Sequence, residues 1–96
     1  MKIEILAEAQ QDLLDGYHFY ERQGAGLGEY FLESLFSDID SLQIYAGVHA
    51  SHWGYYRLLA KRFPYAVYYR VAGTTIRIQA VLDCRRNPVW LRDRLR

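Results

Sequence analysis

The stretch from Lys61 to Val71, Lys-Arg-Phe-Pro-Tyr-Ala-Val-Tyr-Tyr-Arg-Val, most constrains the fold of this chain, because a turn and a strand follow one another in it. Pro64 fixes its own φ and pushes Phe63 towards an extended conformation, so the chain turns here and then runs straight. From Tyr65 onwards, side chains that suit a pleated surface alternate between two faces, and both faces are bulky. This pattern is typical of a central strand with neighbours on both sides.

The rest of the chain supplies the neighbours of this strand. The periodicities predict a strand over residues 2–6, a helix from Ala7 to about Gln23, a second helix from about Leu27 to Tyr45, and strands over Tyr55–Lys61 and Thr75–Leu82. Asn87-Pro88 is typical of a helix start, so a short C-terminal helix to about Asp93 is expected. The predicted fold class is α+β in the order β-α-α-β-β-β, with the helical hairpin packed on one face of a mainly antiparallel four-stranded sheet.

The same alternation predicts which side chains share a face. The second helix should bury Phe31, Leu35, Ile39, Leu42 and either Tyr45 or Ala46. The last strand should carry on one face Ile76, Ile78, Ala80 and Leu82. Residues 46–54 are expected to form a loop that Trp53 anchors on the core, and the alternative role for Trp53 is a stacking platform for a nucleobase.

Size and composition predict a single domain over residues 1–96, globular because 51% of the residues are hydrophobic. Charges interrupt the apolar start, and no run reaches the roughly 20 apolar residues of a membrane span. A cytoplasmic protein without a membrane segment is therefore expected. Cys84 is the only cysteine, and His49 and His52 have no obvious third ligand, so we expect neither a disulfide nor a metal or other cofactor.

Charge is divided unevenly along the chain. Residues 1–54 contain nine acidic and two basic residues, a net charge of −7, whereas residues 55–96 contain ten basic and two acidic residues, a net charge of +8. Such asymmetry favours a basic surface that binds a polyanion or an acidic partner. The alternative is that the two halves pair with each other through surface ion pairs. The arginines of the C-terminal helix, Arg92, Arg94 and Arg96, are expected to keep that end solvated.

Besides the order of its elements, the chain carries a series of short motifs: Gly26-Leu27-Gly28 before the second helix, Arg57, Phe63-Pro64-Tyr65, Tyr68-Tyr69-Arg70, Val81-Leu82 and Arg85-Arg86-Asn87-Pro88. In this order and spacing they resemble the RelE/ParE superfamily of bacterial toxin-antitoxin toxins. The resemblance extends from Ile3 to Trp90 and implies a toxin that is encoded beside an antitoxin, which wraps around it and neutralises it.

The superfamily divides by target. RelE-like members cut messenger RNA on the ribosome, whereas ParE-like members act on DNA gyrase and are not nucleases. RNA cleavage needs a base, an acid and cations on the phosphate. Many relatives carry a histidine just before the final arginines, but Asp83 or Cys84 stands there in this chain. An aspartate beside Arg85 and Arg86 is expected to be ionised and paired, so it cannot donate a proton.

The resemblance therefore favours a ParE-like, plasmid-stabilisation toxin that inhibits DNA gyrase without being an enzyme and binds a cognate antitoxin. The expected binding residues are Arg57, Arg70, Arg77, Arg85 and Arg86. One alternative is a ribosome-dependent mRNA endonuclease, whose catalytic candidates would be Lys61, Arg57, Tyr69 and Arg86, with Tyr55, Tyr56 and Tyr68 as further tyrosines. Another is a degenerate member without toxicity. A homodimer and a heterotetramer with the antitoxin are both open.

Overall fold

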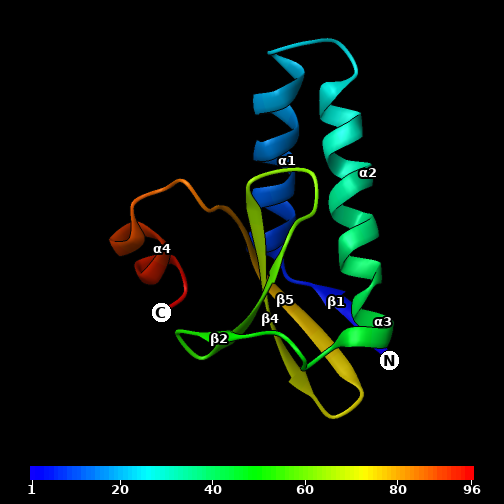
Figure 1. Ribbon diagram of the computed structural model, residues 1–96, viewed down its shortest axis with the longest axis vertical. Helices are drawn as coiled ribbons and strands as arrows, with labels where there is room; N and C mark the ends of the chain where they lie inside the picture. Colours follow the sequence, from blue (N-terminus) through cyan, green and yellow to red (C-terminus); the bar gives the residue numbers. More distant parts are fainter.

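The computed structural model describes all 96 residues, from Met1 to Arg96. Figure 1 shows the α1–α2 hairpin on one side of the strands and α4 on the other. None of the helices has the length and the apolar character needed to cross a membrane. The elements in chain order are β1 (Lys2–Ile5), α1 (Ala7–Glu21), α2 (Leu27–Asp40), α3 (Leu42–Tyr45), β2 (Ser51–His52), β3 (Tyr55–Leu59), β4 (Tyr65–Ala72), β5 (Thr75–Asp83) and α4 (Pro88–Arg94).

The strands form one sheet in the spatial order β1-β5-β4-β3-β2. β1 runs parallel to β5, and the other neighbours are antiparallel. β4 lies in the middle, as its two bulky faces predicted. The α+β class and the order of the elements are thus confirmed, but the sheet has five strands instead of four. The added strand is β2, which lies inside the expected loop because Ser51 and His52 pair with the first residues of β3.

The main core lies between the α1–α2 hairpin and the sheet. The predicted stripe of the second helix is buried there, and of the two candidates for its last position Ala46 packs against the core while Tyr45 is exposed. Gly16 lets the two helices approach, because a Cβ at this position would lie 2.5 Å from the ring of Phe31. The buried members of this core are Ala9, Leu13, Phe31, Leu35, Ile39, Leu42, Tyr65, Val67, Tyr69, Ile76, Ile78 and Val81.

The second helix does not continue unbroken to Tyr45, so the prediction of one helix over residues 27–45 is wrong in its last part. α2 ends at Asp40, and α3 is a single turn. Between them the Ser41 hydroxyl donates a hydrogen bond to the carbonyl of Asp38 at 2.6 Å, a local bond that competes with helical backbone bonding. The buried Asp38 carboxylate also accepts a hydrogen bond from the backbone N–H of Lys61 at 3.1 Å, which ties the helix end to the β3–β4 loop.

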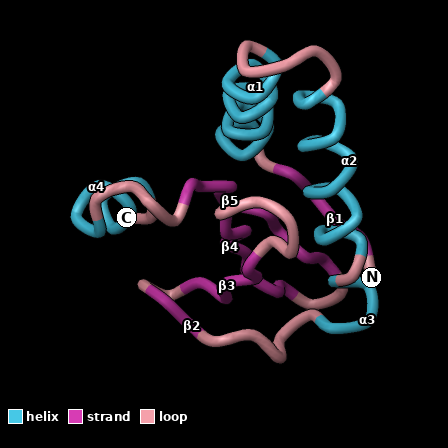
Figure 2. Tube along the Cα trace, turned by 45° about the horizontal axis from the view of Figure 1, so that its top comes forward, coloured by secondary structure: helices cyan, strands magenta, loops and turns pink.

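The C-terminal helix α4 packs on the sheet face opposite the hairpin, and in Figure 2 the strands lie between them. It begins as predicted, because the Asn87 side chain accepts a hydrogen bond from the backbone N–H of Val89 at 2.8 Å. Two leucines of this end of the chain then close a smaller core on the sheet. That core consists of Tyr55, Ala66, Tyr68, Ala80, Leu82, Leu91 and Leu95.

A β-bulge in β5 overturns the prediction that Ala80 and Leu82 share a face with Ile76 and Ile78. The register between β4 and β5 shifts by one residue between Tyr68 and Tyr69. An extra residue in one strand moves the following side chains to the other face. Ala80 and Leu82 therefore lie under α4. The position beneath the helical hairpin is taken by Val81, which the alternation had placed on the other face.

Candidate functional site

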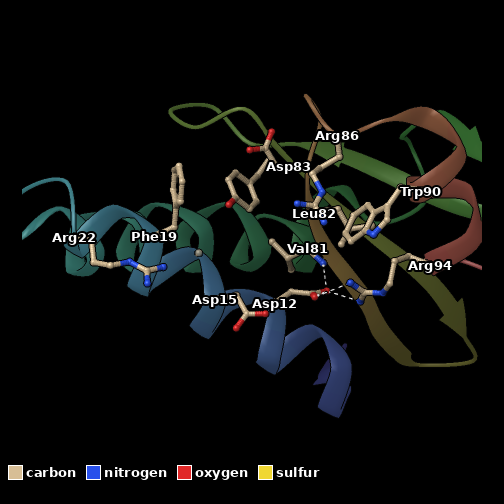
Figure 3. Close-up of a pocket in the computed structure, with 12 residues that line it drawn as sticks. Asp12, Asp15, Phe19, Arg22, Val81, Leu82, Asp83, Arg86, Trp90 and Arg94 are labelled. Carbon is tan, nitrogen blue, oxygen red and sulfur yellow. Dashed lines mark hydrogen bonds and ion pairs between the residues drawn. The ribbon is translucent and has the colours of Figure 1, made fainter.

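A groove of about 320 Å³ opens between α1, the end of β5 and α4 (Figure 3). Three carboxylates and three guanidinium groups line it together with the rings of Phe19 and Trp90, and both of these residues remain partly exposed. Intermixed polar and aromatic surface of this kind is common at protein interfaces. The lining residues are Asp12, Asp15, Gly16, Phe19, Arg22, Tyr65, Val81, Leu82, Asp83, Arg86, Trp90 and Arg94.

One side of the groove is closed by a half-buried ion pair between its two helices. Both nitrogens of the Arg94 fork donate to the two carboxylate oxygens of Asp12, at 2.9 and 2.8 Å. Asp12 also accepts a hydrogen bond from the backbone N–H of Val81 at 3.0 Å. Val81 lies in the part of β5 that follows the residues paired with β1. The bond to Asp12 raises the pKa of Arg94. Arg94 therefore anchors α4, and the expectation that it only solvates the chain end is wrong.

The loop after β5 holds the predicted pair of Asp83 and Arg85. The Arg85 guanidinium donates to both oxygens of Asp83, with its shortest contact at 2.7 Å, and the backbone N–H of Arg85 donates to the same carboxylate at 2.8 Å. The hydrogen bond from the Arg85 side chain lowers the pKa of Asp83, although burial acts in the other direction. Asp83 is thus ionised and paired, as expected.

Arg86 belongs to the groove but takes part in none of the four ion pairs of the chain. Its guanidinium carbon lies 3.9 Å from the ring centroid of Trp90, and that of Arg94 lies 5.8 Å from the same ring. Stacking on an aromatic face holds an arginine in place without neutralising it. The charge of Arg86 therefore remains available to a partner.

Three more of the expected binding residues project from the sheet face on which α4 packs. Arg57 pairs with Tyr68 across the β3–β4 ladder, and Arg70 follows Tyr68 by two positions, so both lie on the face of Tyr68. Arg77 stands directly opposite Arg70 across the β4–β5 ladder. The Nε of Arg77 is 3.9 Å from Glu4, in a pair open to solvent. The five expected arginines thus divide into a sheet group and a loop group.

The catalytic candidates are not brought together. Tyr69 lies in the core under the helical hairpin, where its hydroxyl accepts the backbone N–H of Gly47 at 3.0 Å and contacts His49. Arg57 lies on the opposite face of the sheet. Lys61 is exposed in the β3–β4 loop, and Arg86 follows β5. Of these four residues only Arg86 lines the groove.

The tyrosines near these positions are poorly tuned for proton transfer at neutral pH. Burial raises the pKa of Tyr69 and of Tyr68, and raises that of Tyr65 to about 12. An efficient acid or base has a pKa near the working pH. Tyr55 is buried beneath the guanidinium of Arg70, and Tyr56 stacks on Tyr69.

Histidines and acids do not gather into a metal site, because no group of three such side chains lies close enough to hold an ion. His49 faces Tyr69, and burial lowers the pKa of the His49 imidazole. His52 lies in β2, next to Trp53. The arrangement as a whole offers charged and aromatic binding surfaces.

Two of the groove contacts were missed in the sequence, for different reasons. Asp12 and Arg94 are 82 residues apart, and their pairing requires both helices to be in place. Arg86 and Trp90 are four positions apart, and Arg86 lies just before the N-cap of α4. Their stacking is therefore a local contact that forms where the chain enters the helix.

Comparison with known proteins gives a consistent family assignment. A family model described as the ParE toxin of the type II toxin-antitoxin system parDE matches residues 3–88. A comparison with curated proteins gave no match. Among solved structures, one described as the chromosomal ParDE TA system from P. aeruginosa is similar with a TM-score of 0.69 and 23% sequence identity, over 84% of this chain and 92% of that chain. At this identity the likeness concerns the fold.

Proposed function

Because this chain belongs to the ParE toxin family of type II toxin-antitoxin systems, whose family model matches residues 3–88, we propose that it acts as one toxin domain that inhibits DNA gyrase by binding. A cognate antitoxin would bind and neutralise it, and the pair would serve plasmid stabilisation. On this proposal the chain is not an enzyme. It would work by holding its target in a state that cannot complete its reaction.

One observation carries the choice of binding over RNA cleavage: the candidate catalytic side chains lie on different sides of the sheet. Tyr69 is buried under the helices, whereas Arg57 is on the other face. Asp83 or Cys84 stands where many relatives have histidine, and the lowered pKa of Asp83 keeps its carboxylate ionised at neutral pH. An acid and a base on one bound phosphate would need groups that share a cleft.

Electrostatic contact would come from the arginines that the sequence singled out. Arg57, Arg70 and Arg86 form no ion pair within the chain, and the pairs of Arg77 and Arg85 are open to solvent. Free guanidinium groups steer and orient an acidic partner. Arg86 beside the groove supports contact there, while Arg57, Arg70 and Arg77 support contact at the sheet.

The first experiment adds the purified chain, free of antitoxin, to gyrase and supercoiled plasmid, and measures trapped cleaved DNA. A translating-ribosome sample is probed in parallel for breaks in the RNA. We expect cleaved DNA and intact RNA. RNA cut only in the presence of ribosomes would overturn the proposal in favour of the endonuclease, and no effect in either sample would favour a member without toxicity.

A charge-reversal variant tests the surface. Arg86→Glu leaves every ion pair in place and should lower the yield of trapped DNA at least tenfold, because a repelling charge replaces an attracting one. Arg62→Glu is the matched control, an exposed arginine in the β3–β4 loop that also has no ion pair. Equal activity of the two folded variants would remove the groove from the contact surface.

A further inference from the structure

The turn between β2 and β3 has an unfavourable residue at its tip. Trp53 is the only non-glycine residue with a positive φ, at 53°, and Gly54 follows with a φ of 85°. A two-residue hairpin turn of this kind favours asparagine or glycine, and a bulky side chain there is strained. Even so, the residue is 42% exposed and its ring is not enclosed by the core. Strain kept at an exposed aromatic residue indicates a role other than stability.

The neighbours of Trp53 form a platform of rings and guanidinium groups. Its ring centroid lies 6.4 Å from that of Tyr68. Arg70 is held beside the turn, since its Nε donates to the carbonyl of Gly54 at 3.1 Å and its guanidinium carbon lies 4.0 Å from the ring centroid of Tyr55. These contacts fix the fork and leave both terminal nitrogens of Arg70 without a hydrogen-bond partner.

Positive charge is concentrated on this face beyond what the fold requires. Arg70 and Arg77 stand directly opposite each other on neighbouring strands, a like-charge pair that disfavours the sheet. Glu4 offsets it only weakly, at 3.9 Å from Arg77 with both side chains about half exposed. Arg57 adds a third charge near Tyr68 and has no carboxylate partner. Such a cluster is stabilised when an anion binds across it.

We propose that this Trp53 face, made up of Trp53, Arg57, Arg70 and Arg77, binds a single strand of nucleic acid. The arginine forks would contact successive phosphates, and the indole would stack on an unpaired base. An acidic peptide would satisfy the arginines but would leave the exposed indole without a planar partner. A duplex keeps its bases stacked inside, so it offers the indole no base.

This binding goes beyond the proposed inhibition of gyrase, because it is a property of the chain alone. It requires neither gyrase nor a ribosome, and it predicts no cleavage of the strand. A chain that traps gyrase but binds no oligonucleotide would refute only the Trp53 face. A chain that binds the oligonucleotide but leaves gyrase unaffected would refute only the gyrase proposal.

The test uses the purified chain and a fluorescein-labelled oligothymidylate of about 12 nucleotides, within the usual range of single-strand sites. Fluorescence anisotropy gives the Kd at several salt concentrations. Trp53→Asn should weaken binding at least fivefold while the salt dependence stays unchanged, because it removes stacking and no charge. Arg70→Gln should weaken binding and reduce the slope of log affinity against log salt by about 0.7, the effect of one lost phosphate contact.

Arg62→Gln is the matched control, because it removes the same charge from a loop outside the platform and should leave the affinity within about twofold of the original. Weaker binding by Trp53→Asn can be told apart from a folding defect, because asparagine suits the positive φ at this position. Urea unfolding of this variant should show no loss of stability. The proposal is overturned if the oligonucleotide does not bind, or if Trp53→Asn binds like the original chain. It is also overturned if polyglutamate displaces the oligonucleotide at equal concentration of charge.

Discussion

Asp83 shows how one side chain can be fixed by its neighbour two residues away. The Arg85 fork makes the ionised carboxylate the favoured form in the folded chain and so lowers its pKa. A group whose pKa is lower in the folded state stabilises the protein above its unfolded pKa. That contribution is present above about pH 4 and is lost as the pH falls through the lower, folded value.

We therefore expect Asp83→Asn to lower the free energy of unfolding at pH 7, with a difference from the original chain that disappears as the pH falls well below about 4. Urea unfolding at a series of pH values measures it. Arg85→Gln should remove the same pH-dependent component, because Arg85 is the main cause of the shift. This account would be contradicted if the free energies of unfolding of the original chain and of Asp83→Asn differed by the same amount at every pH down to the acid range.

At the scale of elements, α4 depends on one polar contact besides its leucines. Asp12 receives both Arg94 nitrogens and the N–H of Val81, so three donors lose their acceptor when it is removed. We expect Asp12→Ala to lower the free energy of unfolding by about 1–3 kcal/mol, because half-buried donors lose a charged acceptor. Hydrogen exchange should also become faster in α4.

Asp15→Ala is the matched control for this change. It lies one turn further along α1 in the same groove, but it accepts only the side chain of Gln11, in an exposed contact. Its loss should change stability by no more than about 0.5 kcal/mol. If both variants unfolded at the same urea concentration, the Asp12–Arg94 pair would not be what holds α4.

The sequence was sufficient where an element is determined by its own residues. Pro64 and the two-faced alternation after it gave the central strand, and Asn87 gave the start of α4, because turn, strand and cap preferences act over a few residues. The bulge in β5 is a property of two strands in register, so Ala80 and Leu82 were assigned to the wrong face.

The candidate site was predictable to the same extent. The pairing of Asp83 with Arg85 follows from their separation by two positions at the end of β5. The groove does not, because its walls come from α1, β5 and α4, which only the complete fold brings together. All five expected arginines belong to the basic half of the sequence. Which of them lie on the sheet and which in the loop could be told only once the bulge and the position of α4 were known.

At the scale of the whole molecule, the acidic and basic halves scarcely neutralise each other. Only two ion pairs join them, the exposed pair of Arg77 with Glu4 and the half-buried pair of Arg94 with Asp12. The other two pairs lie within the basic half. Pairing between the two halves, the alternative interpretation of the charge asymmetry, is therefore limited to these two contacts.

We expect added salt to affect binding much more than folding. Raising NaCl from about 0.1 M to about 1 M shortens the Debye length from about 10 Å to about 3 Å. The free energy of unfolding should change by less than about 1 kcal/mol, whereas affinity for gyrase should fall at least tenfold. Urea unfolding and binding to immobilised gyrase in the same buffers measure the two. A large loss of stability with unchanged affinity for gyrase would mean that the charges of the acidic and basic halves mainly stabilise the fold by pairing with each other.

The parallel pairing of β1 with β5 has a consequence for the time at which the fold is completed during synthesis. Residues 2–5 find their partners only at residues 75–78, and the contact that seats α4 joins residues 12 and 94. Contacts between such distant positions form late and fold slowly. During translation a growing chain therefore lacks the complete five-stranded sheet until β5 has emerged from the ribosome. It lacks the groove until α4 has followed. A partner that recognises the complete sheet or the groove can therefore bind only after nearly the whole chain has been made.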